Sequence, residues 1–391
     1  MEFTYKTIDE LVVRIDERNM SNEDIALVGL SIDKCFIPSV ANTIGTDLSK
    51  YKRIYKRDFA VSLMQVSRDS KIPIACLKEY DIAIMSPAYS IFRVKDEKVI
   101  LPEYLEMWFQ RSEFDREAAF IAVGGVRGSM PWDEFAMMKV AVPNLEKQNN
   151  IVRKYKAIND RITLKKKIND NLVATGVASI LKNIGKSALI NLTEAESDNI
   201  VLPVGFAVKT VSEFCSETKS GATPSRTNNE FWRNGTIAWV KSGEVHNNIT
   251  LQTEEYITQS GLDCCSTKLL PKDTVLIAMY GVTAGEVGYL GIEATTNQAI
   301  CGMICNSRTE AAYLYFTLIQ SQEAISHMSN GGAQDNLSKN FIDEIKLVVP
   351  PSDLMETLGL STIIEQLTLN TKEIILLEEL RTTYLVQLSS H

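Results

Sequence analysis

Two stretches decide the fold of this chain: Lys139-Val140-Ala141-Val142-Pro143 and Lys346-Leu347-Val348-Val349-Pro350. Each has the composition of a short strand ended by proline, and a long polar sequence with helical periodicity follows each. A glycine pair precedes each strand, Gly124-Gly125 in the first copy and Gly331-Gly332 in the second. All of these matches lie 207 positions apart (124 to 331, 139 to 346, 143 to 350). The chain therefore contains an internal repeat, which predicts a pseudo-two-fold arrangement of two like units.

The two copies also begin alike. Thr7 with Glu10, and Thr210 with Glu213, have the spacing of a helix capping box, in which each side chain accepts a hydrogen bond from a backbone amide. In the first copy, apolar residues at positions 8, 11, 12 and 15 predict a short amphipathic helix. Between these matched ends the copies barely align, which indicates one shared frame that carries two different inserts.

Each insert has the sequence pattern of a mixed α/β fold. Runs rich in β-branched and apolar residues predict strands over 59–66, 82–85 and 90–94 in the first insert, and over 237–240, 274–280 and 286–290 in the second. Large apolar side chains at helical spacing predict a helix over 103–109, and another helix is expected over 310–325. We therefore expect two domains of the α/β (α+β) class.

The long sequences after Pro143 and Pro350 have the periodicity of a coiled-coil seam. The predicted packing residues are Ile151, Tyr155, Ile158, Ile162 and Leu172 in the first and Leu360, Ile363, Leu367, Ile374, Leu377, Tyr384 and Leu388 in the second. Polar residues interrupt both seams, Lys165 and Asn169 in the first and Asn370 and Arg381 in the second. Because each seam needs a partner, we expect the two helices to pair with each other, antiparallel.

These features divide the chain into five parts. We assign 1–143 and 206–350 to two α/β domains, 144–182 and 351–391 to the long helices, and 183–205 to a linker. At the usual helical rise, the 28 steps from Leu360 to Leu388 span about 42 Å. One turn of B-DNA is about 34 Å. An antiparallel pair of such helices would hold the two inserts about one DNA turn apart.

The composition is that of a globular protein, with 45% hydrophobic and 23% charged residues among 391. The apolar runs are far shorter than the roughly 20 residues of a membrane span. The first ten residues lack a signal-peptide core, so we expect a cytoplasmic protein without membrane contact. Seven cysteines without zinc-type spacing, and three histidines, predict neither a metal site nor a catalytic Ser/His/Asp or Cys/His set. The net charge of −8 is uneven, with +2 on residues 1–180 and −10 on residues 181–391.

Taken in order, several short motifs resemble those of the specificity (S) subunits of type I restriction-modification systems, over essentially the whole chain. In the first copy they are Ser86 to Tyr89 with Phe92, Gly124 to Ser129, and Pro143 with Leu145, Glu146 and Gln148. In the second they are Ser220 to Ser225, Phe231-Trp232, Trp239, Ser242-Gly243, Asn297-Gln298, Gly331-Gly332, Gln334 and Asn336 to Ser338. One departure is Leu354-Met355, where the family usually keeps a Glu-Gln pair.

This resemblance implies that each insert is a target-recognition domain that reads one half of a split, asymmetric site in double-stranded DNA. The long helices would set the gap between the half-sites and dock two methyltransferase (M) subunits. The M subunits would carry S-adenosylmethionine chemistry on adenine N6, and restriction (R) subunits would add translocation and cleavage that need ATP and Mg²⁺. The chain itself would be non-catalytic and hold no cofactor.

The candidate DNA contacts are basic and amide side chains, because these bind phosphate and read base edges. In the first domain they are Lys50, Lys52, Arg53, Lys56, Arg57, Arg68 and Arg127. In the second they are Arg226, Asn228, Arg233, Lys241, Gln334 and Asn336. The run from Lys50 to Arg57 also suits a solvated charged face, and Arg127, Gln334 and Asn336 also suit a role in pinning the loop between insert and helix.

Two other functions stay open from the sequence. A self-contained adenine-N6 DNA methyltransferase needs a glycine-rich cofactor loop and an intact base-holding motif. In Ser86-Pro87-Ala88-Tyr89, alanine replaces the second proline of that motif, and no such glycine loop lies upstream. A coiled-coil scaffold without DNA specificity needs only the two helices.

Overall fold

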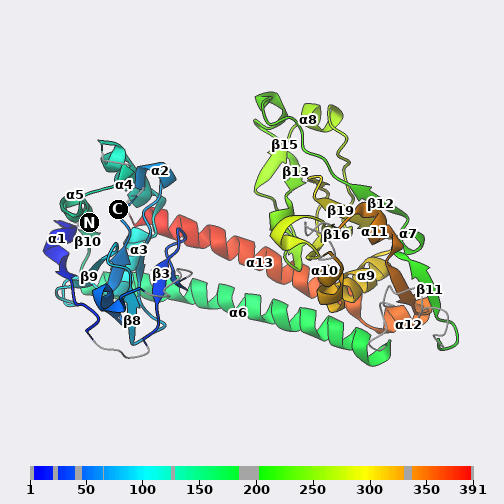
Figure 1. The fold of residues 1–391 in the computed structure, drawn as a ribbon, viewed down its shortest axis with the longest axis horizontal. Coiled ribbons are helices and arrows are strands. Elements are labelled where there is room, and N and C mark those ends of the chain that lie inside the picture. Colours follow the sequence, from blue (N-terminus) through cyan, green and yellow to red (C-terminus); the bar gives the residue numbers. More distant parts are fainter. Residues whose placement is uncertain are drawn as a thin grey trace. The chain divides into compact units, whose positions relative to one another are not determined.

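The computed structural model describes residues 4–20, 25–39, 46–64, 66–124, 128–184, 202–329 and 337–388. The chain forms two compact units, which we call the first unit (residues 1–162 and 377–391) and the second unit (residues 163–376). Each unit holds one insert and part of both long helices, α6 (Leu145–Asn183) and α13 (Leu360–Gln387) (Figure 1). Among the described residues no helix combines the length and the apolarity needed to cross a membrane.

The first unit is built on an antiparallel sheet with the strand order β2-β9-β6-β7. Its strands are β2 (Val12–Ile15), β6 (Phe59–Val61), β7 (Ile74–Cys76) and β9 (Ser90–Val94). Three strand pairs flank it: β1 (Thr4–Thr7) with β10 (Lys139–Val142), β3 (Val28–Leu30) with β4 (Phe36–Pro38), and β5 (Lys52–Tyr55) with β8 (Ile82–Met85). The short helices are α1 (Ile8–Leu11), α2 (Val66–Asp69), α3 (Pro102–Phe109), α4 (Ser112–Ile121) and α5 (Trp132–Met137).

The second unit has a five-stranded sheet with the order β12-β19-β16-β17-β14. Its strands are β12 (Glu217–Ser220), β14 (Asn248–Thr250), β16 (Val275–Ala278), β17 (Val287–Leu290) and β19 (Ile300–Ile304). A second sheet joins β13 (Ile237–Val240), β15 (Glu255–Ile257) and β18 (Thr295–Thr296), and β11 (Ala207–Thr210) pairs with β20 (Lys346–Val349). The helices are α7 (Val211–Phe214), α8 (Gln259–Asp263), α9 (Arg308–Gln320), α10 (Gln322–Ser329), α11 (Lys339–Glu344) and α12 (Ser352–Thr357).

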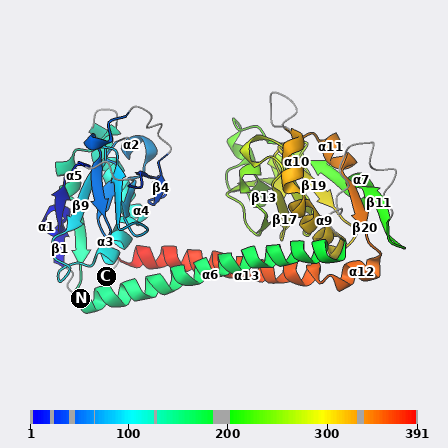
Figure 2. The same ribbon diagram turned by 60° about the horizontal axis from the view of Figure 1, so that its bottom comes forward.

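The repeat predicted from the sequence is a repeat of structure. The order β2-β9-β6-β7 in the first unit corresponds to β12-β19-β16-β17 in the second, and only the second adds β14 at the edge. Both capping boxes form, at Thr7 with Glu10 and at Thr210 with Glu213. Figure 2 shows β9 beside α3 in the first unit and β19 beside α9 in the second. The α/β class and the two long helices are confirmed.

The helices α6 and α13 run antiparallel within each unit. In the second unit, Ser179 Oγ donates to the carbonyl of Leu358 at 3.2 Å, and Asn370 Nδ2 donates to Asn169 Oδ1 at 3.0 Å, so residue numbers rise on one helix as they fall on the other. Of the predicted seam residues, Ile162, Leu360, Leu367, Ile374 and Leu388 are buried, and Ile151, Tyr155, Ile158, Leu172, Ile363, Leu377 and Tyr384 are half-buried. Ile180 and Ile364, both fully buried, were not among the predicted residues.

Several element boundaries differ from the sequence-based expectation. The helix predicted over positions 8–15 ends at Leu11, because the β-branched residues of Val12–Ile15 pair with β9. The single helix expected over 310–325 is divided into α9 and α10 at Ser321. The long helix expected after Pro350 is also two helices, α12 and α13, because Gly359 has a φ of +69° that a continuous helix does not allow.

Candidate nucleic-acid interface

The glycine segment before each long helix meets the insert through the same backbone hydrogen bond. The amide of Met130 donates to the carbonyl of Leu63 at 2.9 Å, and the amide of Leu337 donates to the carbonyl of Met279 at 2.8 Å. Met130 and Leu337 are 207 positions apart, so they are equivalent in the repeat. Leu63 and Met279 follow the equivalent strands β6 and β16. A turn follows each of these strands. We call the turn after β6 the first tip (residues 62–73) and the turn after β16 the second tip (residues 279–286). The two tips are therefore equivalent elements of the repeat.

The first tip carries α2 and one of the predicted DNA contacts. Arg68 is exposed, and its guanidinium binds both carboxylate oxygens of Asp69, at 2.6 and 3.0 Å. The hydrogen bonds from Arg68 lower the pKa of Asp69. Gly128 packs on the same turn so closely that a Cβ there would lie 2.3 Å from Ser67 Oγ. Arg127 lies outside the described residues, and its neighbour Gly128 lies close to the backbone of Arg68.

The second tip is a tight turn with a 3-10 helix, Gly281–Thr283, at its apex. Gly281 and Gly285 have φ angles of +79° and +87°, which glycine alone adopts without strain. The amide of Gly285 donates to Ala278 at 2.9 Å and that of Ala284 to Gly281 at 3.0 Å, so the turn is closed by its own backbone. Gln334 and Asn336, two predicted contacts, lie outside the described residues.

The basic run of the first unit is not a free cationic surface. Its members lie on or beside β5, and carboxylates of the same unit bind four of them: Lys50 with Asp47, Lys52 with Asp16, Lys56 with Asp81, and Arg57 with both Glu97 and Glu103. Arg53 Nε donates to Asn19 Oδ1 at 3.4 Å. The basic side chains of this run therefore form ion pairs within their own unit. These pairs favour the interpretation as a solvated charged face over the interpretation as a phosphate-binding surface.

Lys52 is a correction to the sequence-based expectation. Its residue is only 5% exposed, and its ammonium donates to the carbonyl of Tyr89 at 2.9 Å. Side chains alternate between the two faces of a strand, so Lys52 and Ile54 on β5 point inward while Arg53 and Tyr55 are half-exposed. Burial lowers the pKa of Lys52 more than the carboxylate of Asp16 raises it. Lys52 holds the Tyr89 turn in place and does not reach the surface.

Arg226 lies in an aromatic box in the second unit. Its guanidinium stacks 3.8 Å from the ring centre of Trp232 and 4.7 Å from that of Trp239, and the two indoles meet edge to face. The same guanidinium forms an ion pair with Glu255, and this hydrogen bond is the main cause that lowers the pKa of Glu255. Arg226 is thus committed to cation–π contacts within its own unit.

The other predicted contacts of the second unit are placed differently from one another. Lys241 pairs with Glu254 and, at 3.3 Å, with Glu255. The Asn228 side chain accepts a hydrogen bond from the amide of Glu230 and so caps a turn. Arg233 is exposed, and its side chain has no ion pair or hydrogen bond with any residue that the structure describes. Arg233 is therefore the predicted cation of this unit that is open to a phosphate.

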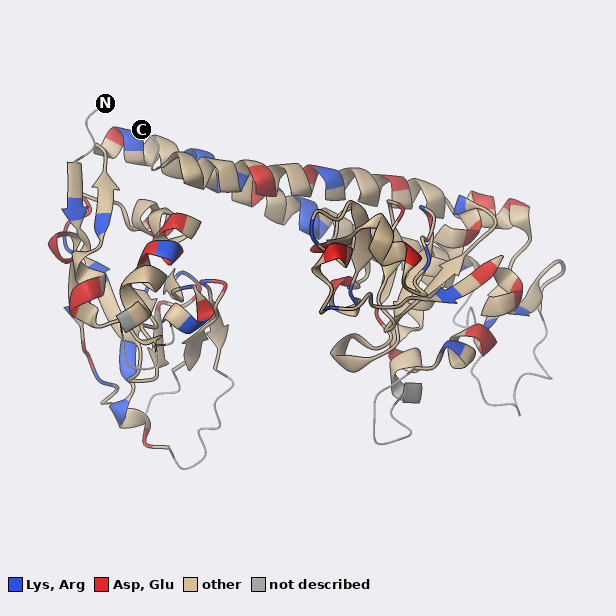
Figure 3. Ribbon diagram, turned by 90° about the horizontal axis from the view of Figure 1, so that it is seen from above, with Lys and Arg blue, Asp and Glu red and all other residues tan. Residues whose placement is uncertain are grey.

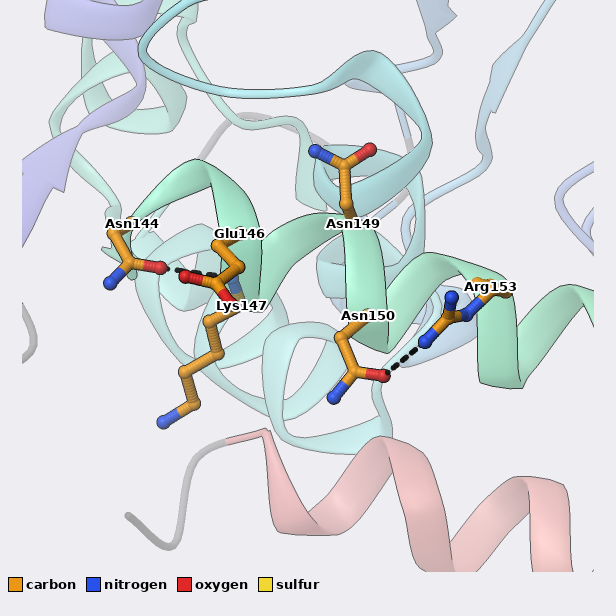
Figure 4. Close-up of a pocket in the computed structure, with 6 residues that line it drawn as sticks. All are labelled: Asn144, Glu146, Lys147, Asn149, Asn150 and Arg153. Carbon is orange, nitrogen blue, oxygen red and sulfur yellow. Dashed lines mark hydrogen bonds between the residues drawn. The ribbon is translucent and has the colours of Figure 1, made fainter.

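A polar groove of about 880 Å³ lies at the start of α6 (Figure 4). Its lining residues are Asn144, Glu146, Lys147, Asn149, Asn150 and Arg153. Asn144 Oδ1 accepts from the amide of Lys147 at 2.9 Å and so caps the helix. Beneath it, the fully buried Gln148 accepts from the amide of Leu101 and donates to the carbonyls of Val99 and Pro143. These bonds fix the origin of α6 on the first unit.

Charge is mixed over the described surface of both units. Figure 3 shows Lys and Arg positions interspersed with Asp and Glu positions along the elements of each unit. The candidate DNA contacts were chosen among basic and amide residues, so they do not include the exposed apolar residues of the two tips, Met64, Tyr280 and Val282. For the second tip the sequence does hold a signal, the glycine-rich loop after a strong strand pattern, because a bare loop carrying Tyr280 and Thr283 could approach a DNA groove.

Comparison with known proteins bears on this interface. Residues 203–379 match the family described as type I restriction modification DNA specificity domain. The EcoR124I/EcoR124II specificity subunit of Escherichia coli is 26% identical over 135 residues, which is 33% of each chain. The MjaIX specificity subunit of Methanocaldococcus jannaschii is 26% identical over 163 residues, 40% of this chain and 36% of that one. The matched stretch is thus about a third of the length of these curated relatives.

The fold gives a longer match. The crystal structure of the type I restriction-modification S subunit from M. genitalium superposes with a TM-score of 0.54 and 16% identity, covering 99% of this chain and 96% of that one. Residues 203–379 are thus similar to the type I specificity domain, and the whole chain shares its fold with that S subunit.

Proposed function

We propose that this chain is the DNA-specificity subunit of a type I restriction-modification complex and that each unit recognises one half of a bipartite, asymmetric site. The proposal rests on the observation that the two units share one framework of strands and helices but expose different side chains on their tips. Sheet order, capping boxes and the bonds of Met130 and Leu337 are the same in both units. The tips differ, with Arg68 exposed on the first and Val282 on the second. Two half-sites of different sequence need this combination.

Recognition belongs to this chain in the proposal, and chemistry to its partners. Two M subunits supply adenine-N6 methylation with S-adenosylmethionine, and R subunits supply cleavage with ATP and Mg²⁺. The ion pairs within each unit support this division of roles between the chain and its partners. Arg57, Arg226 and Lys241 are neutralised by carboxylates of their own unit. Phosphate contact supplies much of the affinity of DNA-binding proteins, so we expect the M subunits to provide most of it.

The long helices suit the docking of M subunits. Leu369 and Leu376 lie one heptad apart on α13, and they are 57% and 63% exposed although α13 already packs on α6. An apolar pair at this spacing is what an added amphipathic helix requires. The exposed pair supports assembly through the helices and leaves the tips free for DNA.

The test is a methylation map. The complex of this chain with its M subunits should methylate adenines in one split sequence, and a host lacking this chain should lose methylation at that sequence. Two results would favour the alternative functions. Methylation by the purified chain alone with S-adenosylmethionine would indicate a self-contained methyltransferase. Equal binding of all duplexes by the assembled complex would indicate a scaffold without specificity.

A further inference from the structure

We propose that the two tips are the elements that contact base edges, and that the second tip does so through apolar side chains, Tyr280 and Val282. This inference rests on the proposed function and names residues that carry it. The predicted DNA contacts were basic or amide residues, and Val282 and Tyr280 were not among them. The partner is a base edge that presents an apolar group, and the thymine C5-methyl in the major groove is the one that DNA offers.

Two apolar side chains of the second tip are exposed. Val282 is 104% exposed and Tyr280 is 39% exposed. A single exposed apolar residue is ordinary on a protein surface. Here, however, the exposed valine stands at the apex of a tight turn, directly before the buried Thr283, which is only 8% exposed.

Contacts on both sides support the apex of the second tip. Ser326 Oγ on α10 donates to the carbonyl of Ala284 at 3.3 Å, and a Cβ on Gly285 would lie 2.5 Å from Ser326 Oγ. On the other side, Leu337 donates to Met279. The tip is therefore fixed on both sides, and it presents Val282 in a defined direction. Recognition of a base edge requires side chains held in this way.

Charge is absent from most of the second tip. The stretch from Ala278 to Gly285 contains no acidic or basic residue. The nearest carboxylate along the chain, Glu286, binds His246 Nδ1 at 2.6 Å. The uncharged stretch from Ala278 to Gly285 approaches the phosphates of a DNA groove without repulsion, and because it holds no cation it gains little from phosphate contact alone. Such a tip contributes selectivity rather than general affinity.

The first tip is equivalent to the second. Met64 follows Leu63 as Tyr280 follows Met279, and Met64 is 51% exposed. Arg68 lies a few residues further on the same turn and is held by Asp69, with its remaining donors exposed. The two tips thus occupy one place in the frame with different chemistry. The first tip pairs an apolar group with a guanidinium, which binds guanine edges, and the second tip exposes Tyr280 and Val282 on an uncharged stretch.

The test uses the chain assembled with its M subunits and duplexes that contain the mapped site. V282D and its control V204D change the same residue type at nearly the same exposure, since Val204 is 101% exposed and lies in the same unit. We expect V282D to lose at least fivefold in affinity for the specific duplex, the smallest usual cost of one mismatched base pair. We expect V204D to bind like the unchanged chain. V282D should no longer distinguish the half-site read by the second unit, while the other half-site stays selective.

The first tip offers a matching pair. M64D should lose selectivity only at the half-site of the first unit, and M137D is its control because Met137 is also an exposed methionine of that unit, at 66%. The proposal is overturned if V282D and M64D bind and discriminate like their controls, or if they lose M-subunit assembly instead of DNA selectivity. Failure of the proposed function has a separate sign, because the unchanged complex would then prefer no sequence.

Discussion

Lys165 Nζ donates to Asn370 Oδ1 at 2.9 Å, so the polar residue that interrupts the seam of α6 meets the polar residue that interrupts the seam of α13. Asn370 also donates to Asn169, and Lys165 forms an ion pair with Glu373 at 2.9 Å. In the first unit, Arg381 binds Asn159 in the same manner. A shift of one heptad would bring Asn370 toward Leu172, where its amide would lose these partners. The interruptions therefore select one register of the helix pair.

Replacement of Asn370 tests this layer. Asn370 is 6% exposed, so N370A leaves Asn169 and Lys165 each short of a partner inside the helix pair. We expect a loss of about 1–3 kcal/mol in the free energy of unfolding, measured by urea denaturation. Q366A changes an exposed residue of the same helix and should shift stability by less than about 0.5 kcal/mol. Equal effects of the two substitutions would show that the polar layer does not stabilise the pair.

Gln148 and Met355 are equivalent in the repeat, and exchanging their residue types should fail in both directions. Q148M strands the amide of Leu101 and the carbonyls of Val99 and Pro143, while M355Q places an amide among the apolar residues around Leu358 and Leu360. Each should cost about 1–3 kcal/mol, visible as a lower urea midpoint. A neutral Q148M would mean that the three bonds to Gln148 contribute nothing net to stability.

Gly176 allows α6 to approach α9 in the second unit. A Cβ at this position would lie 2.4 Å from the ring of Phe316, which is fully buried. Alanine favours a helix by about 1 kcal/mol over glycine, but overpacking costs about 1–3 kcal/mol. We expect G176A to lower the thermal midpoint despite its better helix propensity. G243A, where nothing lies within 4 Å of the added Cβ, is the control and should leave the midpoint unchanged.

The sequence predicted the parts of the fold that depend on periodicity and on the repeat. The offset of 207 makes Met130 and Leu337 equivalent in the repeat. The sequence also shows that Lys165 and Asn370 interrupt the apolar seams of the two long helices. The pairing of those breaks depends on the register of two helices far apart in sequence. Val12–Ile15 was predicted as helix because apolar residues at positions 8, 11, 12 and 15 have helical spacing, yet pairing with β9 decides its conformation. Local pattern carries no information about such tertiary contacts.

The candidate interface was less predictable than the fold. Charge pointed to Lys52 and Arg226, and the structure buries the first and stacks the second between Trp232 and Trp239. Ion pairs within a unit are invisible to a count of basic residues. The candidate contacts left out the tip residues because these side chains are apolar, and exposure cannot be read from residue type.

The carboxylate of Glu255 gives the second unit a defined response to acid. Arg226 and, to a lesser degree, Lys241 lower the pKa of Glu255 below its usual 4.5. A carboxyl group whose folded pKa is depressed stabilises the fold above its unfolded pKa, and this contribution is lost as pH falls from about 4.5 through the folded value. We expect E255Q to flatten the decline of the unfolding midpoint below pH 5. E293Q, at an exposed position, should leave the slope unchanged.

The measurement that tests the account most directly is a methylation map of a chimaera. Residues 20–120, which include the first tip and exclude α6, are exchanged for the corresponding residues of another family member, and the chimaera is assembled with the same M subunits. Adenine methylation is then mapped across the host genome. The account predicts a new sequence at one half-site, with the other half-site and the gap between them unchanged. A change in both half-sites, or in neither, would contradict independent reading by two units on one frame.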